Sequence, residues 1–266
     1  MAITKIPAAG FTGNNFRNII INGDMSIAQR GTSTTGVTTS DGYYACDRWY
    51  SQTDIGTWTI SQSTDVPTGQ GFLNSFKMDC TSAGTGNADE VMIRSKHEGQ
   101  NLQYLKYGTS SAESITLSFW VKSNKTGTYT LEYQSHGATT RSISKSYTID
   151  SANTWERKSM TIAPITSGTW VRDSTNGLYL RVNMGSPSGR TAAANGWRSG
   201  NFDGADGSTG AVTWATTNGA TFYMTGCQIE VGDIATDFEH RSFGEEFQLC
   251  QRYYSKASQY GSAWNA

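Results

Sequence analysis

Imidazole chemistry in this chain would have to use its three histidines, His97, His136 and His240, because histidine is the usual general base, proton shuttle and metal ligand. They lie far apart in the sequence, none belongs to an HExxH pattern, and neither a GxSxG elbow nor a phosphate-binding loop occurs. His240 lies between Glu239 and Arg241, where charge pairing or hydrogen bonding at a helix start is the simpler interpretation. We therefore predict a protein without enzymatic activity and without a cofactor.

The carboxylates keep one enzymatic alternative open. A pair of carboxylates that cleaves a glycosidic bond can come from positions far apart in a sequence, so spacing does not identify it. A polysaccharide depolymerase therefore remains an alternative interpretation.

The four cysteines are the remaining candidates for metal or redox chemistry. Cys46, Cys80, Cys227 and Cys250 are widely separated, without CxxC spacing and without a nearby pair of histidines. We expect reduced thiols in a core, with a zinc site or a disulfide network as the alternatives. No metal site is predicted.

Residues 185–220 form the longest stretch without a strand pattern, and loops of this length commonly bind a ligand. Indole rings stack on the apolar faces of sugars, and Asp and Arg side chains can address the hydroxyl groups. Asp203 and Asp206 could bind calcium, but an EF-hand loop needs further oxygen ligands at alternate positions and a Glu at its end. The sequence predicts a recognition loop, or alternatively tryptophans that cover one end of the fold. The candidate residues are Trp197, Arg198, Asp203, Asp206 and Trp214.

Two other tryptophans lie in strand-like runs. Trp120 is on the opposite side of its strand from the apolar residues, so it is either a ligand contact or covered by the C-terminal helix. In the run Asp47, Arg48 and Trp49, adjacent side chains of a strand point to opposite faces, so the first two are not expected to pair with each other. We expect Trp49 in the core and Arg48 paired elsewhere.

Alternation of apolar and polar residues predicts most of the secondary structure. It is clearest over residues 115–121, and a turn at 124–127 followed by a second alternating run over 129–133 predicts a hairpin. Further strands are predicted over residues 58–60, 76–80, 91–93, 143–149, 158–162, 178–184 and 222–231, with a short helix over 101–107. Because the gaps lack crossover helices, we predict an all-β, antiparallel, jelly-roll-like β-sandwich.

The two ends of the chain differ from the middle. Residues 1–15 show no alternation and predict an extended arm. Near the other end, Ser242 and Glu245 form a capping box, and the spacing of Phe243, Phe247, Cys250 and Tyr254 predicts one apolar stripe on a short helix. That helix packs on its own sheet or on a neighbouring subunit. The predicted parts are an arm over 1–15, a sandwich over 16–235, and a C-terminal helix and tail over 236–266.

Charge and hydropathy exclude two classes of partner. The formal net charge is −1 and only 16% of residues are charged, so the basic footprint that binds a nucleic-acid backbone is not expected. No apolar run approaches about 18 residues, and the first residues lack a signal-peptide pattern, which predicts no membrane insertion and synthesis in a cytosol.

Four strings in this sequence resemble a β-sandwich domain of tail-fibre and minor virion proteins of tailed bacteriophages. They are NIIINGDMSIAQRGTS (Asn18–Ser33), DRW (Asp47–Trp49), SFWVKS (Ser118–Ser123) and TGCQIEVGDIATDFEHRSFGEEFQLCQRYY (Thr225–Tyr254). The resemblance covers about Phe16 to Tyr254. The strings NIIINGDM and FYMTGCQIEVGD also resemble the first and last strands of jelly-roll carbohydrate-binding modules. Those modules often hold calcium with an aromatic and an acidic residue after NGD, whereas Met25 and Ser26 stand here.

The resemblance implies a structural protein of a bacteriophage virion, assembled in the bacterial host cytoplasm, in a tail fibre or similar appendage that contacts host surface glycans. Other virion proteins and further copies of the chain, as in a trimer, are the implied partners. A capsid or tail decoration protein, anchored by the N-terminal arm and the C-terminal helix, is the alternative. The candidate contact residues are Phe11, Phe16, Phe243, Phe247, Tyr253 and Tyr254.

Overall fold

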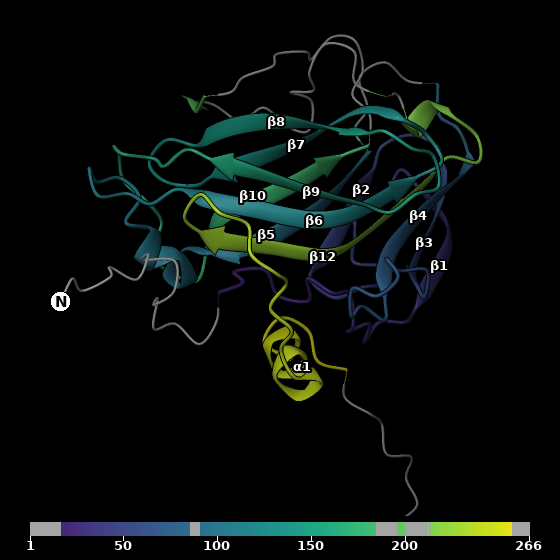
Figure 1. The fold of residues 1–266 in the computed structure, drawn as a ribbon, viewed down its shortest axis with the longest axis horizontal. Coiled ribbons are helices and arrows are strands. Elements are labelled where there is room, and N and C mark those ends of the chain that lie inside the picture. The colour runs from purple at the N-terminus through teal and green to yellow at the C-terminus, as the bar shows by residue number, and fades with distance from the viewer. Residues whose placement is uncertain (1–16, 86–90, 185–195, 200–211, 213, 257–266) are drawn as a thin grey trace, which may run out of the picture.

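The computed structural model describes residues 17–85, 91–184, 196–199, 212 and 214–256. In this part of the chain two six-stranded sheets pack face to face, and every strand pair is antiparallel (Figure 1). Sheet A has the order β1 (Ser33–Thr38), β3 (Thr57–Ser63), β4 (Ser75–Ser82), β12 (Thr221–Val231), β6 (Ile115–Ser123) and β9 (Glu156–Ile162). Sheet B has the order β11 (Arg198–Ser199), β8 (Arg141–Ile149), β7 (Gly127–Ser135), β10 (Asn176–Asn183), β5 (Val91–Glu98) and β2 (Trp49–Thr53). The predicted all-β, jelly-roll-like sandwich is confirmed.

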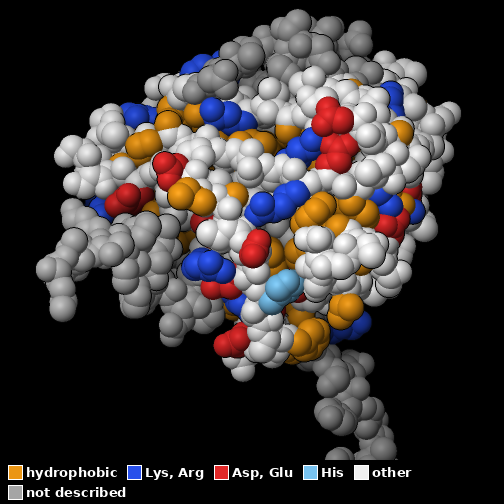
Figure 2. Space-filling view, in the orientation of Figure 1, with side chains coloured by type: hydrophobic (Ala, Val, Ile, Leu, Met, Phe, Trp, Pro, Cys, Tyr) orange, Lys and Arg blue, Asp and Glu red, His pale blue; other side chains and the backbone are white. Residues whose placement is uncertain are grey.

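All nine runs predicted as strands are strands, whereas β1, β2 and β11 were not predicted. The inward side chains of β2 are Trp49, Ser51 and Thr53, so it lacks apolar alternation, and β1 buries only Val37. The helix predicted over 101–107 is a 3₁₀-helix, η2 (Gly99–Leu105). The surface in the view of Figure 2 is mostly neutral, with acidic and basic side chains interspersed, as the low charge content predicts.

The hairpin predicted at 124–127 is wrong. β6 pairs with β12 and β9 in sheet A, whereas β7 pairs with β8 and β10 in sheet B, so the turn crosses between the sheets. Asn124 fastens this turn, because its side chain donates to the Gly219 carbonyl (2.7 Å) and accepts from the Thr221 amide (2.9 Å). Alternation shows that each strand has an apolar face, but it does not say to which sheet that face belongs.

Large aromatic side chains fill the space between the sheets. Trp58 stacks on Trp214, which lies in the short 3₁₀-helix η3 (Trp214–Thr216), with ring centroids 4.8 Å apart, and Phe222 meets the edge of Trp214. The cysteines are buried and free, which confirms the predicted reduced thiols; they are Cys46, Cys80, Cys227 and Cys250. Burial raises the pKa of the Cys80 thiol to about 11.

The segment NIIINGDM, expected to be a first strand, has no strand structure. It runs along the edge of β12, where the Ile19 amide donates to the Ile229 carbonyl (3.0 Å) and the Cys227 amide donates to the Gly23 carbonyl (2.9 Å). Asn22 has φ of 59°, so the backbone turns away instead of continuing as a strand. The motif is therefore a turn that packs against sheet A.

Both faces of β12 are buried, although alternation predicts one. The outward side chains Gln228 and Glu230 are covered by residues 236–239. The Gln228 side chain donates to the Asp237 carbonyl (3.1 Å) and accepts from the Glu239 amide (2.8 Å), while the Glu230 carboxylate accepts from the Thr236 amide (3.0 Å). This segment leads from the sheet to the C-terminal helix.

The helix α1 (Phe243–Gln251) lies below the sandwich in Figure 1 and packs on its own chain. Its capping box is confirmed, since Ser242 accepts from the Glu245 amide and the Glu245 carboxylate accepts from the Ser242 amide. The predicted stripe is wrong at Phe243, which is 66% exposed, because the inward side chains are Glu246 and Cys250. None of the described helices is long and apolar enough to cross a membrane.

The contact between Gly23 and β12 leaves no room for a side chain. A Cβ at Gly23 would lie 2.1 Å from the Cys227 carbonyl oxygen. We expect Gly23→Ala to lower the free energy of unfolding by about 2–4 kcal/mol, because the turn must move off the strand. Gly244→Ala in α1, where no atom lies within 4 Å, should instead raise it by about 0.5–1 kcal/mol through helix propensity. Urea denaturation measures both, and equal stability of the two variants would contradict this packing.

Candidate functional site

The residues predicted to form a recognition loop do not converge on one site. Trp214 is completely buried in its stack with Trp58, so its assignment as a ligand contact is wrong, and the alternative of a tryptophan that covers one end of the fold is correct for it. Trp197 is half-buried, and its Nε1 donates to the Ala163 carbonyl (2.7 Å). Arg198 pairs with Ser142 at the edge of sheet B. Asp203 and Asp206 lie outside the described residues.

The other predicted contact residues have different surroundings. Trp120 is half-buried on the outward face of sheet A, between its cross-strand neighbours Arg157 and Thr225. Phe243 is exposed and its ring stacks on Phe247, with centroids 6.0 Å apart. Phe11 and Phe16 lie outside the described residues.

The two C-terminal tyrosines are engaged within the chain. The guanidinium of Arg48 lies 3.5 Å from the ring centre of Tyr253, and that of Arg30 lies 3.5 Å from that of Tyr254. Trp49 is fully buried, as expected, and Arg48 donates to the Lys96 carbonyl, but Asp47 and Arg48 lie in a turn before β2 and not in a strand. A pocket of about 150 Å³ lies here, lined by Arg30, Tyr43, Asp47, Arg48, Cys250, Tyr253 and Tyr254.

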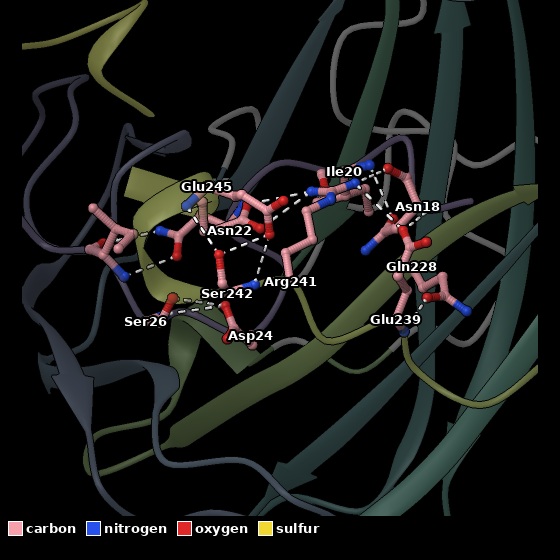
Figure 3. Close-up of polar contacts among 12 residues, drawn as sticks. Asn18, Ile20, Asn22, Asp24, Ser26, Gln228, Glu239, Arg241, Ser242 and Glu245 are labelled. Carbon is pink, nitrogen blue, oxygen red and sulfur yellow. Dashed lines mark hydrogen bonds and ion pairs between the residues drawn. The ribbon is translucent and has the colours of Figure 1, made fainter. Parts of the chain in front are cut away.

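A network that we call the latch joins the N-terminal segment to the C-terminal helix (Figure 3). It consists of Asn18, Asn22, Glu239, Arg241 and Glu246. The Asn18 side chain acts as a strand residue would, because its Oδ1 accepts from the Ile229 amide (3.1 Å) and its Nδ2 donates to the Cys227 carbonyl (3.0 Å).

Asn22 is the centre of the latch. Its Nδ2 donates to the carbonyls of Ile27 (2.9 Å) and Asp47 (2.8 Å), and its Oδ1 accepts from the Ile27 amide (2.9 Å). Its own carbonyl accepts from Trp49 Nε1 (2.8 Å), and its amide donates to the Glu246 carboxylate. One fully buried asparagine thus connects the first turn, the start of β2 and α1.

The charged members of the latch are nearly buried. Arg241 contacts Glu246 at 3.2 Å and donates to the carbonyls of Asn18 and Ile20. Burial raises the pKa of Glu246, and Arg241 opposes that rise. The Glu239 carboxylate accepts from the amide of Asn18 (2.8 Å). All these contacts are made within the chain, so the latch connects the N-terminal segment to the C-terminal helix.

The outward face of sheet B carries the candidate site, which we call the sheet B site: Tyr50, Arg94, Lys96 and Tyr179. β5 lies between β2 and β10, and the register places Tyr50 opposite Arg94 and Tyr179 opposite Lys96. The Lys96 ammonium is 5.3 Å from the ring centre of Tyr50 and 5.4 Å from that of Tyr179. All four side chains are half-buried. Two partly exposed rings therefore flank a lysine on a rigid surface.

The sequence contained a weak signal for this site. In WYSQT and LYLRV, a tyrosine follows a buried residue and so faces away from the core, but tyrosines such as Tyr129 and Tyr133 face inward in the same sheet. Only the pairing of β2 and β10 with β5 brings Tyr50 and Tyr179 together.

The charges that act on Lys96 all come from arginines, while a carboxylate that acts on Tyr50 is that of Asp41. Burial lowers the pKa of Lys96, and the nearby charges of Arg94, Arg48 and Arg181 lower it further. His136, whose ring centre is 4.5 Å from that of Tyr179, also has a lowered pKa, first from burial and then from Arg181 and Lys96.

The outward face of sheet A has a comparable aromatic cluster with balanced charges. Lys122 lies 4.5 Å and Lys77 5.4 Å from the ring centre of Tyr223. Lys77 pairs with Asp79 at 2.8 Å, and Lys122 pairs with Asp65. Each lysine on this face therefore has its own carboxylate.

The histidines are dispersed over the structure. His97 is buried, His136 belongs to the outward face of sheet B, and the His240 ring contacts Phe72 and Phe238 instead of pairing charges at the helix start. The described residues include no group of three or more His, Cys, Asp or Glu side chains arranged to hold a metal ion.

No protein-family model matches the chain, and no curated protein matches its sequence. Solved structures similar to it include the enzymatically active domain of bacteriophage CBA120 tailspike protein 4, with a TM-score of 0.44 and 13% identity over 80% of this chain and 21% of that chain. A family 30 carbohydrate-binding module has a TM-score of 0.36 and 9% identity over 86% of this chain and 93% of its own. The N-terminal cellulose-binding domain of Cellulomonas fimi β-1,4-glucanase C has a TM-score of 0.34 and 10% identity over 79% and 99%.

These are the two classes of protein that the sequence resembles. This chain spans about a fifth of the tailspike chain that it matches, 21%. Similarity at these TM-scores and identities carries no functional argument, so function has to be argued from the site.

Because Asn22 lies at the centre of the latch, we expect its substitution to affect stability strongly. We expect Asn22→Ala to lower the free energy of unfolding by about 3 kcal/mol or more, because it leaves buried amide and carbonyl groups unpaired. Asn153 has the same backbone region, with φ of 56°, but is exposed, so Asn153→Ala reports the backbone contribution alone. Denaturant titration compares them, and equal losses would show that the side-chain hydrogen bonds contribute nothing.

His97 should make stability depend on pH. Burial, reinforced by Arg48 and opposed by a hydrogen bond to Ile19, lowers its pKa from 6.5 to about 3. Above pH 6.5 the ring is neutral in both states and has no effect. Below it the unfolded chain binds a proton that the folded chain does not, so the free energy of unfolding falls with a slope that approaches about 1.4 kcal/mol per pH unit. Unfolding measured between pH 6.5 and 5 should be flatter in His97→Gln; an unchanged slope would refute this.

Proposed function

We propose that this protein is a structural component of a bacteriophage virion, in a tail fibre or similar surface appendage, that binds glycans at the sheet B site without cleaving them. The observation that carries the binding proposal is the pair of partly exposed rings, Tyr50 and Tyr179, on either side of Lys96. The sequence resemblance to tail-fibre and minor virion proteins supports the location.

The geometry suits a sugar ligand. Aromatic rings stack on the apolar face of a pyranose, and adjacent donors hydrogen-bond to its hydroxyl groups. Here Arg94 and Lys96 supply the donors, and both lie on the central strand of the site. Strands hold such groups more rigidly than loops do, so little ordering is needed on binding. A shallow site of this kind binds weakly, and several copies on one particle would supply avidity.

The alternative of a decoration protein is favoured by one observation. Phe243 is 66% exposed at the start of α1, although its ring stacks on Phe247. An exposed aromatic of this kind is a natural contact with another virion protein. Tight association with purified capsids, without glycan binding, would favour this function.

Removal of one ring should weaken glycan binding. We expect Tyr179→Ala to lower the affinity for glycans identified on an array by roughly tenfold, because stacking of one aromatic ring on a sugar contributes on the order of 1–1.5 kcal/mol. Tyr223→Ala removes a similar ring from sheet A and is the matched control. Titration calorimetry measures both. Equal effects of the two variants, or no glycan binding by the wild type, would refute the assignment.

The same samples distinguish binding from cleavage. Release of reducing ends from a bound polysaccharide would establish a depolymerase and overturn the non-catalytic part of the proposal.

A further inference from the structure

We infer that the glycan bound at the sheet B site is acidic, and that Lys96 with Arg94 forms the subsite for its carboxylate or sulfate group. This inference rests on the proposed function and adds the chemical class of the ligand.

Neither Lys96 nor Arg94 has a carboxylate partner in the part of the chain that the structure describes. Among the ion pairs of the described residues, none includes Lys96 or Arg94. The Lys96 ammonium contacts two tyrosine rings, and Arg94 donates to the neutral Gln52 side chain at 2.8 Å. Arg94 also lies 4.7 Å from the ring centre of Tyr50. Partly buried cations without a counter-charge favour an anionic ligand.

Positive charges accumulate around Lys96. Arg48, Arg94 and Arg181 all act on Lys96 and make its protonated form less favourable. Glu132 lies in the same face, but its carboxylate pairs with Arg181 at 3.3 Å. A bound anion would offset the repulsion among these cations. An acidic sugar would therefore bind here more tightly than a neutral sugar.

The outward face of sheet A differs from that of sheet B in how its lysines are paired. On sheet A, Lys77 and Lys122 also lie near an aromatic ring, but each is paired with an aspartate. Both faces therefore offer rings and lysines, but the lysines beside Tyr223 are paired with carboxylates, whereas Lys96 and Arg94 belong to none of the ion pairs of the described residues. The difference argues for a charge-specific role and not for a general property of the surface.

The geometry also places the charge correctly for a sugar. Arg94 and Lys96 are two residues apart in β5, so their side chains leave the same face of the sheet. Lys96 lies between the two rings, so a sugar stacked on either Tyr50 or Tyr179 would bring an acidic substituent near its ammonium group.

The test uses matched acidic and neutral glycans. The full chain is titrated with polygalacturonate, polysialic acid and heparin oligosaccharides, and with the same oligosaccharides after carboxyl reduction or desulfation. We expect at least one acidic member to bind roughly tenfold more tightly than its neutral counterpart, as for one charge-assisted hydrogen bond. This preference should shrink as NaCl rises from about 50 to about 300 mM.

Variants connect the preference to the site. Lys96→Gln should remove most of the difference between acidic and neutral forms, whereas Lys77→Gln on sheet A should preserve it. Thermal unfolding of both variants confirms that they fold. Carboxyl-reduced and desulfated heparin distinguish a carboxylate from a sulfate as the recognised group.

Three outcomes overturn the inference in different ways. Equal affinity for acidic and neutral forms would refute the acidic specificity and leave the proposed glycan binding intact. Binding of inorganic sulfate alone as tightly as any oligosaccharide, unaffected by Tyr179→Ala, would show a simple anion site. A lack of binding to every acidic and neutral oligosaccharide would refute both the inference and the proposed function.

Discussion

The buried amide of Asn22 is the contact on which the arrangement of this protein depends. Its side chain can donate twice and accept, and all of this capacity is used on backbone groups of Ile27 and Asp47. Its left-handed backbone conformation, tolerated better by asparagine than by most residues, turns the chain so that its amide meets Glu246. A buried network of this kind stabilises the fold only when it is complete, so the first turn, the start of β2 and α1 depend on one another.

The latch also sets the position of the sheet B site. The Asn22 carbonyl holds the Trp49 indole, and Trp49 begins β2, whose next residue is Tyr50. On the adjacent turn, Arg48 extends to the Lys96 carbonyl and to the Tyr253 ring. The C-terminal segment is therefore linked to β5 through Arg48, and to β2 through Asn22. This explains why the strings NIIINGDM, DRW and QRYY, far apart in the sequence, belong to one structural unit that acts on the sheet B site only indirectly.

Local sequence patterns were sufficient to predict where most strands lie, but not which strands pair with one another. Residues 115–121 and 143–149 each carry their apolar side chains on one face, and these side chains are buried in the core, so alternation located both strands correctly. The same pattern could not separate β6 from β7, which face a common core from opposite sheets. Trp214 shows the related limit for function, because an indole among glycines and serines has the same sequence context whether it meets a sugar or stacks on Trp58. The capping box was predictable, since both of its partners lie within one helical turn.

The outward faces of the two sheets have similar aromatic clusters but differ in whether their lysines are paired with carboxylates. The chain has a net charge of −1 and few charged residues, so a local group of uncompensated cations is not a consequence of composition. Sheet A neutralises its lysines with Asp65 and Asp79, which shows that this fold can supply counter-charges beside an aromatic ring. At Lys96 it does not, although burial and neighbouring arginines already make the ammonium less favourable. A charge kept at such a cost to stability is better explained by an interaction made with a partner than by the needs of the fold itself.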